Sequence, residues 1–301
     1  MRIGTFVFTD GADLDGIIER VRAADAGLDA VHFSQVLSWD ALTAAALAGR
    51  EVPGIDVGVA VVPTYPRHPL ALAGQALSVQ AATGNRLVLG IGPGHPSMME
   101  GWYGYSYDRP VRHVREYLTA LRPLLRGEDV EYRGETLTAV GRVDVPGAEP
   151  PPVLLAALGP QMLRIAGRLA DGTVTTWANP PVIADHVAPS IVRAAEEAGR
   201  PAPRVVVTFL ASVTADPDGL RRTLAEQFAG VAELPAYKAL LDRQGLDGPE
   251  QTAALGDEAE VERAVRAYRD AGATELVVVA MGTPEEQART IELAASLRRT
   301  L

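Results

Sequence analysis

The sequence predicts a (β/α)₈ barrel, the TIM-barrel architecture. Eight short apolar segments of strand length alternate along the 301 residues with segments whose apolar residues recur at helical spacing. The short segments are continuously apolar, as is typical of parallel strands that are buried on both faces. We therefore expect one barrel domain spanning residues 1–301. A doubly wound sheet is the weaker alternative, because no G-x-G-x-x-G motif follows the first strand.

The expected strands are rich in β-branched residues, and an expected helix follows each of them. Several helices run into a glycine just before the next strand, which fits the left-handed position that closes a helix. These glycines are Gly27, Gly84, Gly172 and Gly272. The expected strands are Arg2–Phe8, Asp29–Gln35, Ile55–Val62, Arg86–Gly92, Val153–Ala157, Thr173–Trp177, Arg204–Val213 and Glu275–Met281. The expected helices are Leu14–Ala26, Trp39–Ala48, Leu70–Ala82, Val111–Leu125, Pro160–Leu169, Val182–Ala198 and Glu285–Leu301, with a broken helical region from Gly219 to Arg269.

Two insertions interrupt this alternation. An aromatic, glycine-rich loop lies between Pro93 and Pro110, after the fourth strand, and we expect it to line the active site. The second insertion, Gly127–Pro152, lies between the fourth helix and the fifth strand and predicts a small hairpin that turns at Arg133–Gly134. Later in the chain, Ala232–Gly256 is expected to lie over the seventh strand and to form part of a lid.

Composition and charge exclude several classes of protein and site. The chain has no cysteine, which removes disulfides, thiolate catalysis and cysteine-ligated metals. Its net charge of −10 argues against nucleic acid as a partner, because binding to a phosphate backbone needs a basic surface. No apolar run of membrane-spanning length occurs, and no signal peptide is expected ahead of the first strand. We expect a cytoplasmic protein without a metal site, since the five histidines show no ligand spacing.

The stretch from Pro152 to Trp177 predicts a strand, a helix and a second strand in quick succession. Gly159 and Pro160 break the first strand, and Pro160 suits the first helical turn because its missing N–H has no partner there. A helix that starts at a glycine turn presents free backbone N–H groups and the positive end of its dipole. This turn is therefore a candidate site for a phosphate.

The expected carboxyl ends of the strands, where barrel enzymes carry their active sites, are apolar, aromatic or amide-bearing. Strand two ends at Ser34–Gln35, strand four at His95 and strand six at Trp177. No pair of carboxylates stands there to support glycoside hydrolysis, and no G-x-S-x-G motif marks a serine nucleophile. The remaining interpretation is a pocket for a flat ring and a phosphate, which indicates a cofactor that brings its own chemistry.

Four stretches carry a family resemblance, namely Val61–Pro69, Leu89–His95, Tyr107–Pro110 with Arg115–Leu118, and Ala156–Pro160 with Ala170–Gly172. Together they resemble the bacterial luciferase-like superfamily, over essentially the whole chain. Within that superfamily the chain is most similar to the oxidoreductases that use the deazaflavin coenzyme F420. The resemblance implies a TIM barrel, coenzyme F420 as the cofactor and a small-molecule substrate, and similar proteins are often homodimers.

The resemblance also implies particular binding residues. It places a non-prolyl cis peptide and a bulge at the end of the third strand, within Ala60, Val61 and Val62, where the backbone would contact the cofactor ring. It places the cofactor phosphate on the turn after the fifth strand, which agrees with the turn found above. The phosphate would meet the N–H groups of Leu158, Gly159, Gln161 and Met162, with Ala157 and Pro160 completing the turn.

Three side chains are candidates for the chemistry. His95 is expected to donate a hydrogen bond or a proton to the substrate or the ring, because imidazole titrates near neutral pH; a structural loop histidine is the alternative. Gln35 is expected to face the pocket, since a buried amide needs a partner. Trp177 is expected to form a wall beside the ring or the substrate, although aromatic residues at barrel rims also serve packing. His32 and His113 are expected to be structural.

Three functions remain open from the sequence. The first is a coenzyme F420-dependent oxidoreductase that transfers a hydride between the deazaflavin and a small organic substrate. The second keeps the fold and uses FMN, as a luciferase-like monooxygenase. FMN also needs a phosphate site, so the turn at Gly159 does not distinguish these two. The third is a non-catalytic barrel that binds a cofactor without turnover, because a fold alone does not establish a function.

Overall fold

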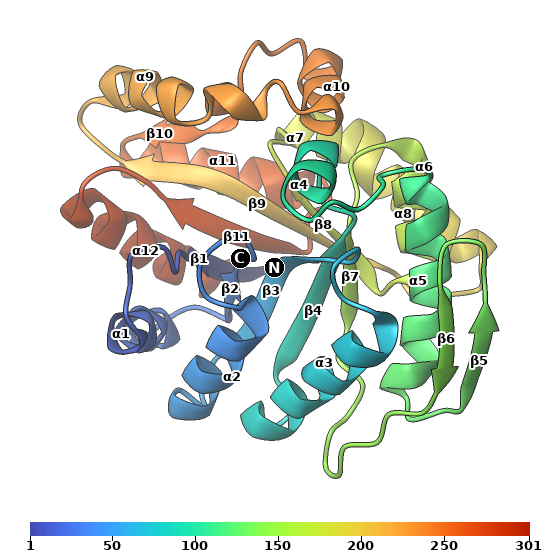
Figure 1. Cartoon of the computed structure of the whole chain (residues 1–301). Coiled ribbons are helices and arrows are strands. Elements are labelled where there is room, and N and C mark those ends of the chain that lie inside the picture. Colours follow the sequence, from blue (N-terminus) through green and yellow to red (C-terminus); the bar gives the residue numbers. More distant parts are fainter.

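The computed structural model describes residues 1–301 and contains eight parallel strands closed into a barrel (Figure 1). The first strand pairs with the second on one side and with the last on the other, and the pairing of β8 with β9 completes the ring. This closure confirms the predicted (β/α)₈ architecture. The barrel strands are β1 (Arg2–Val7), β2 (Ala30–Phe33), β3 (Asp56–Pro63), β4 (Leu87–Gly92), β7 (Val153–Ala156), β8 (Gly172–Thr176), β9 (Arg204–Val213) and β11 (Glu275–Ala280).

Helices surround the barrel, and the two chain termini lie together (Figure 1). The amino group of Met1 donates a hydrogen bond to the carbonyl oxygen of Leu301 at 3.4 Å. The helices are α1 (Leu14–Asp25), α2 (Ala41–Glu51), α3 (Pro69–Thr83), α4 (Pro96–Gly101), α5 (Pro110–Leu125), α6 (Pro160–Leu169), α7 (Pro180–Val182), α8 (Ala188–Glu197), α9 (Pro217–Gln227), α10 (Pro235–Gln244), α11 (Glu258–Asp270) and α12 (Pro284–Arg298), with a π-helical turn at Ile183–Val187 and short 3₁₀ turns at Ala229–Val231 and Pro249–Thr252.

Two apolar layers separate the inside of the barrel from its outside. Alternate strand residues point outward and join the helices in a large core that includes Phe33 and Leu89, both fully buried. The residues between them point inward and form a smaller cluster on the barrel floor. Its members are Val88, Leu154, Val174, Val206 and Val277. The alternation therefore tells which strand side chains can reach a ligand inside the barrel.

The amino-terminal end of the barrel is closed by buried charges. Glu275 and His32 are each 1% exposed, and their side chains meet at 3.0 Å between Oε1 and Nε2. The other oxygen of Glu275 is bound by Arg204 and lies 3.4 Å from the Nε atom of Arg2. Burial alone would raise the pKa of Glu275, but the His32 hydrogen bond and the arginine charges lower it to about 2. His32 is thus structural, as expected.

Both predicted insertions are present. The aromatic loop after β4 contains the short helix α4, which the sequence did not indicate. The second insertion forms an antiparallel hairpin of β5 (Val130–Arg133) and β6 (Thr138–Gly141), which confirms the expected hairpin. The hairpin lies against the outside of α5 (Figure 1). A third short strand, β10 (Ala254–Gly256), extends the sheet beside the upper half of β9.

Two of the four glycines that were expected to close helices have another role. Gly84 and Gly272 do adopt positive φ angles, of 66° and 100°. Gly172 does not, and a Cβ atom there would collide with the carbonyl oxygen of Arg204. Gly27 does not either, since a Cβ there would lie 2.5 Å from the Cβ of Ala295. These two positions need glycine for close packing between elements, not for backbone conformation.

No helix of the structure combines the length and the apolar character that a membrane span needs. The barrel uses the chain from its first strand to its last helix. That residues 1–301 form a single domain remains a prediction.

Candidate functional site

Two cavities lie side by side at the carboxyl ends of the barrel strands. The outer cavity has a volume of about 530 Å³ and reaches from β4 and the aromatic loop to the first turn of α6. The inner cavity has a volume of about 380 Å³ and lies over the barrel interior. Because they share several wall residues, we treat them as two compartments of one site. The shared residues are Val61, Ala156, Val174, Thr175, Thr176 and Tyr237.

A bulge in β3 forms the common wall. The pairing of β3 with β4 shifts register between Val59 and Val62, and the Ala60–Val61 peptide bond is cis. A Cβ atom at Gly90 would collide with the carbonyl oxygen of Val59, so glycine on β4 permits the close approach. Ala60 borders the inner cavity and Val61 borders both. Val62 borders neither, because its side chain is fully buried in the outer core.

The turn between β7 and α6 forms the far end of the outer cavity. All six residues predicted there, Ala157 to Met162, line that cavity. Gly159 is the N-cap of α6 and supplies no side chain for capping, so the first N–H groups of the helix have no partner within the chain. A Cβ atom on Gly159 would have no neighbour within 4 Å. The turn therefore combines unpaired donors with open space beside them.

His186 fixes the orientation of this turn. It lies in the π-helical turn after α7, and its Nε2 atom donates a hydrogen bond of 2.9 Å to the carbonyl oxygen of Leu158. That carbonyl shares a planar trans peptide unit with the N–H of Gly159, and the two groups point in opposite directions. Holding the carbonyl on His186 therefore turns the Gly159 N–H away from His186. The sequence did not single out this histidine.

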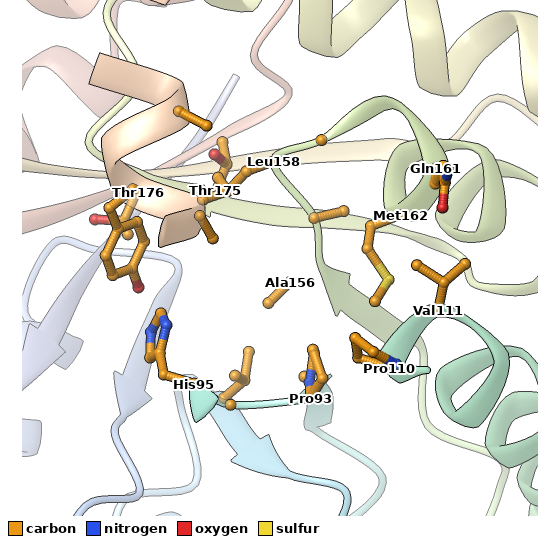
Figure 2. Close-up of a pocket in the computed structure, with 18 of the residues that line it drawn as sticks. Pro93, His95, Pro110, Val111, Ala156, Leu158, Gln161, Met162, Thr175 and Thr176 are labelled. Carbon is orange, nitrogen blue, oxygen red and sulfur yellow. The ribbon is translucent and has the colours of Figure 1, made fainter. Parts of the chain in front are cut away.

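His95 stands at the other end of the outer cavity, as Figure 2 shows with Gln161 and Met162 on the opposite side. It is half-buried, with its ring 4.9 Å from that of Tyr237, and has no hydrogen-bond partner within the chain. Burial lowers the pKa of His95 and raises that of Tyr237 to about 12. Both groups are thus neutral at pH 7 and free to bind a ligand.

Trp177 forms a wall of the inner cavity, where the sequence predicted a wall. Its ring packs against Phe228 at 5.0 Å between centroids. Its backbone has a φ of 58°, which is unusual for a bulky residue and has to be held by the surroundings. Gln244, at the end of α10, donates to the carbonyl oxygen of Trp177 at 2.9 Å and accepts from the N–H of Asn179 at 2.6 Å.

Gln35 lies outside both cavities, at the start of α2. Its side-chain oxygen accepts hydrogen bonds from the N–H of Ala41, at 2.9 Å, and from Arg67, at 3.2 Å. Arg67 also binds Asp40, the N-cap of α2. Gln35 lines neither cavity, because its amide is engaged at the start of α2. A catalytic role for Gln35 thus stays a prediction that these contacts do not support.

The aromatic loop reaches the outer cavity through Tyr107. Its hydroxyl donates to the carbonyl oxygen of Gly94 at 2.8 Å, and its ring stacks on that of Tyr65 at 5.4 Å. His113 lies beneath Tyr65, with ring centroids 4.0 Å apart, and burial lowers its pKa to about 4. This stack keeps the loop against the strand ends, and His113 has the structural role that was expected.

Several site residues had no signal in the sequence. Phe228 and Tyr237 come from the segment between β9 and β10. Tyr237 falls within Ala232–Gly256, which was expected to form part of a lid, whereas Phe228 lies before that region. Phe6 and Thr208 line the inner cavity from β1 and β9. Inward-facing positions could have been found from the two-residue alternation along these strands, had the register been known. No three acidic or histidine side chains lie together as a group that could bind a metal ion.

Comparison with known proteins agrees with this geometry. A family model described as luciferase-like monooxygenase matches residues 1–300. A protein of Mycobacterium tuberculosis, provisionally named a coenzyme F420-dependent oxidoreductase, is 31% identical over 172 residues. That match covers 52% of this chain and 50% of the relative, so the chain matches about half of that protein's length.

A second relative and a solved structure match more of the chain. The F420-dependent glucose-6-phosphate dehydrogenase of Nakamurella multipartita is 28% identical over 262 residues, covering 79% of this chain and 76% of the relative. The structure of the coenzyme F420-dependent tetrahydromethanopterin reductase of Methanopyrus kandleri has a TM-score of 0.78 at 21% identity, over 98% of this chain and 97% of that one. The structural match supports the fold.

Proposed function

The chain belongs to the luciferase-like monooxygenase family, and from this premise we propose that it is a coenzyme F420-dependent oxidoreductase. It transfers a hydride between the deazaflavin and a small organic substrate. Two relatives named for this cofactor, at 31% and 28% identity, support the assignment. The observation that carries it is the turn at Gly159, where unpaired N–H groups border a cavity large enough for a ring and its side chain.

The residues present fit such a cofactor. The N–H groups of Gly159, Gln161 and Met162 would bind its phosphate, at the positive end of the α6 dipole. The apolar wall made by Val61, Ala156 and Val174 suits the face of a flat ring. When bound, the deazaflavin supplies the hydride or takes it up. Residues of the protein would carry out the remaining tasks, which are substrate binding, orientation, proton transfer and exclusion of water.

The protein's own side chains bind and orient the substrate and transfer a proton. His95 would hold or release the proton at the oxygen of the substrate while the hydride moves at the adjacent carbon. Its lowered pKa keeps the neutral, proton-accepting imidazole dominant at pH 7, which suits removal of a proton from an alcohol. Tyr237 packs against His95 and covers both compartments, so it would exclude water from the site.

FMN is the second candidate cofactor, because it too carries a phosphate that the Gly159 turn could bind. A luciferase-like monooxygenase using FMN would consume oxygen, whereas deazaflavin carries carbon in place of the reactive central nitrogen of flavin. A phosphorylated sugar as substrate has less support, since no lysine or arginine lines either cavity.

Titration of the purified protein with each cofactor tests the proposal. We expect coenzyme F420 to bind and FMN to bind more weakly, as followed by quenching of cofactor fluorescence. Turnover should then proceed without oxygen uptake. Tight binding of FMN with substrate-dependent oxygen uptake would establish the monooxygenase instead. Binding of F420 without turnover of a panel of alcohols, aldehydes and ketones would indicate the non-catalytic barrel.

A further inference from the structure

The inner cavity is built from apolar and aromatic side chains. Phe6 and Leu210 line it from the barrel strands, and Trp177 and Phe228 close it above. The single carboxylate in its lining, Asp10, is exposed, and no cationic side chain borders the cavity. A charged group inside would lose hydration without gaining a partner of opposite charge.

Five hydroxyl-bearing residues interrupt this apolar surface, namely Ser34, Thr175, Thr176, Thr208 and Tyr237, and two of them lie at one level of the barrel. Thr176 on β8 and Thr208 on β9 are register partners on adjacent parallel strands. Each lies two residues beyond an inward-facing valine, Val174 or Val206, so both side chains point into the barrel. Side chains at paired positions on one face of a sheet lie close enough to act on the same group.

Neither hydroxyl is used by the protein. Thr208 is 9% exposed and lines the inner cavity, yet its side chain has no hydrogen-bond partner within the chain. Thr176 borders both compartments, is likewise unpaired, and lies at the His95 end of the site (Figure 2). Thr173, on the outward face of the same strand, instead donates to the carbonyl oxygen of Leu155 at 2.9 Å. A buried hydroxyl is normally hydrogen-bonded, so the unpaired Thr208, with the half-buried Thr176 beside it, points to a ligand.

We infer that the inner cavity binds an uncharged, mainly apolar substrate and holds its carbonyl or hydroxyl oxygen on Thr176 and Thr208. This inference rests on the proposed function and names its substrate class. At roughly 30 Å³ for each water-sized group, the cavity holds about a dozen non-hydrogen atoms. A monocyclic ketone or the matching secondary alcohol has this size and polarity. The threonine pair determines specificity because its hydroxyls hydrogen-bond one oxygen but carry no charge to offset the hydration that an ion would lose.

Ligand-observed NMR titration of the full-length protein tests the inference without cofactor. The probe is cyclohexanone, compared with cyclohexanecarboxylate and cyclohexylammonium, which keep the ring and add a charge. We expect cyclohexanone to bind at least tenfold more tightly than either ion. Tighter binding of the ammonium would point to Asp10, and tighter binding of the carboxylate would exclude the neutral class; either result overturns the inference.

Isosteric variants test the two hydroxyls. Thr208→Val and Thr176→Val should each weaken cyclohexanone binding about threefold to tenfold, the range for one hydrogen bond between neutral groups. Thr173→Val is the matched control, because it removes a buried hydroxyl from the same strand outside the cavity, and it should leave the Kd unchanged. An unchanged Kd in both inward variants would overturn the assignment.

The Kd for coenzyme F420 in the same variants separates substrate from cofactor. We expect it to stay within twofold for Thr208→Val, since Thr208 borders only the inner compartment. Weaker F420 binding with unchanged cyclohexanone binding would assign the hydroxyls to the ring and contradict the inference. Failure of the wild-type protein to bind F420 would refute the proposed function, whereas the cyclohexanone measurements are independent of that result.

Discussion

The two ends of the barrel use polar groups in opposite ways. At the amino-terminal end, both oxygens of the buried Glu275 carboxylate are bound, by His32 on one side and Arg204 on the other. At the carboxyl-terminal end, the ring of His95 and the hydroxyl of Thr208 have no partner within the chain. The amino-terminal end binds both oxygens of its buried carboxylate and stabilises the fold. The other end leaves the His95 ring and the Thr208 hydroxyl free, and that is the end that can bind a ligand.

The largest effect is expected at the closed end. Glu275→Ala leaves the buried His32 and the partly buried Arg204 without their common partner, so the free energy of unfolding should fall by about 3–5 kcal/mol, as when other buried ion pairs are broken. Denaturant titration measures the change. Glu258→Ala, which removes an exposed carboxylate paired with Arg289, is the control and should have little effect. An equally stable Glu275 variant would contradict the structural role of this cluster.

The ionised Glu275 carboxylate makes the free energy of unfolding depend on pH. Because its pKa in the folded protein is about 2, below the ordinary value of about 4.3, Glu275 contributes stability that is fully present above about pH 4.5. That contribution is lost as the pH falls toward 2. The difference in stability between the wild type and Glu275→Gln should therefore shrink across this window. A difference that stayed constant from pH 5 to pH 2.5 would show that the carboxylate is not held ionised.

His95→Ala should act at the open end, on turnover and not on stability. Positioned acid–base groups contribute roughly 10²- to 10⁴-fold, and we expect kcat to fall by this factor with little change in F420 affinity. Since the pKa of His95 is lowered, alcohol oxidation should be near its maximum at pH 7 and should fall in acid, while ketone reduction should rise. A variant with unchanged kcat and pH profile would remove His95 from the mechanism.

Gly159→Val should abolish the phosphate contact. A Cβ atom at Gly159 has no neighbour within 4 Å, and the φ of −87° there is open to any residue, so the fold should be retained. The branched side chain would occupy the space beside the N–H groups, and we expect F420 affinity to fall at least about 100-fold, or about 2.7 kcal/mol. Gly159→Ala should give an intermediate loss. Unchanged affinity in both variants would place the phosphate elsewhere.

His186→Ala is expected to have the smallest effect. It frees the Leu158 carbonyl without touching the ligand, and F420 affinity should fall roughly fivefold, the value of about one hydrogen bond. His186→Gln, which keeps a side-chain N–H donor, should restore most of the loss. Binding of the dephosphorylated cofactor analogue should not respond to either variant. An equal loss for that analogue would mean that His186 acts on the ring and not on the phosphate turn.

The barrel could be read from the sequence because each unit repeats a local signal. Strand length, helical periodicity and the glycine-rich turns are encoded within about thirty residues each. The Gly159 turn was predictable for the same reason, since a glycine followed by proline marks a helix start without reference to the rest of the chain. The cis peptide and the bulge at Ala60–Val61 were implied by family resemblance and are present.

What the sequence did not reveal depends on contacts between distant segments. Gln35 lies just beyond β2, and its side-chain orientation is set by Ala41 and by Arg67, thirty-two positions later. Thr176 and Thr208 lie side by side only because β8 and β9 pair in a particular register. His186 reaches the carbonyl of Leu158, in the Gly159 turn, from a helical turn that follows the next strand. None of these relations has a local signature, so they could not be predicted from one sequence.

Helix α10 and the turn before it form one contiguous segment that supplies several residues at the site. Phe228, Tyr237 and Gln244 lie within one contiguous segment, outside the repeating strand–helix units, and this segment roofs the inner compartment. The Gly159 turn is encoded some seventy positions earlier. Because Ala236, Tyr237 and Ala239 of this segment also border the outer compartment, its exchange between homologues would reshape both compartments and leave the Gly159 turn itself unchanged.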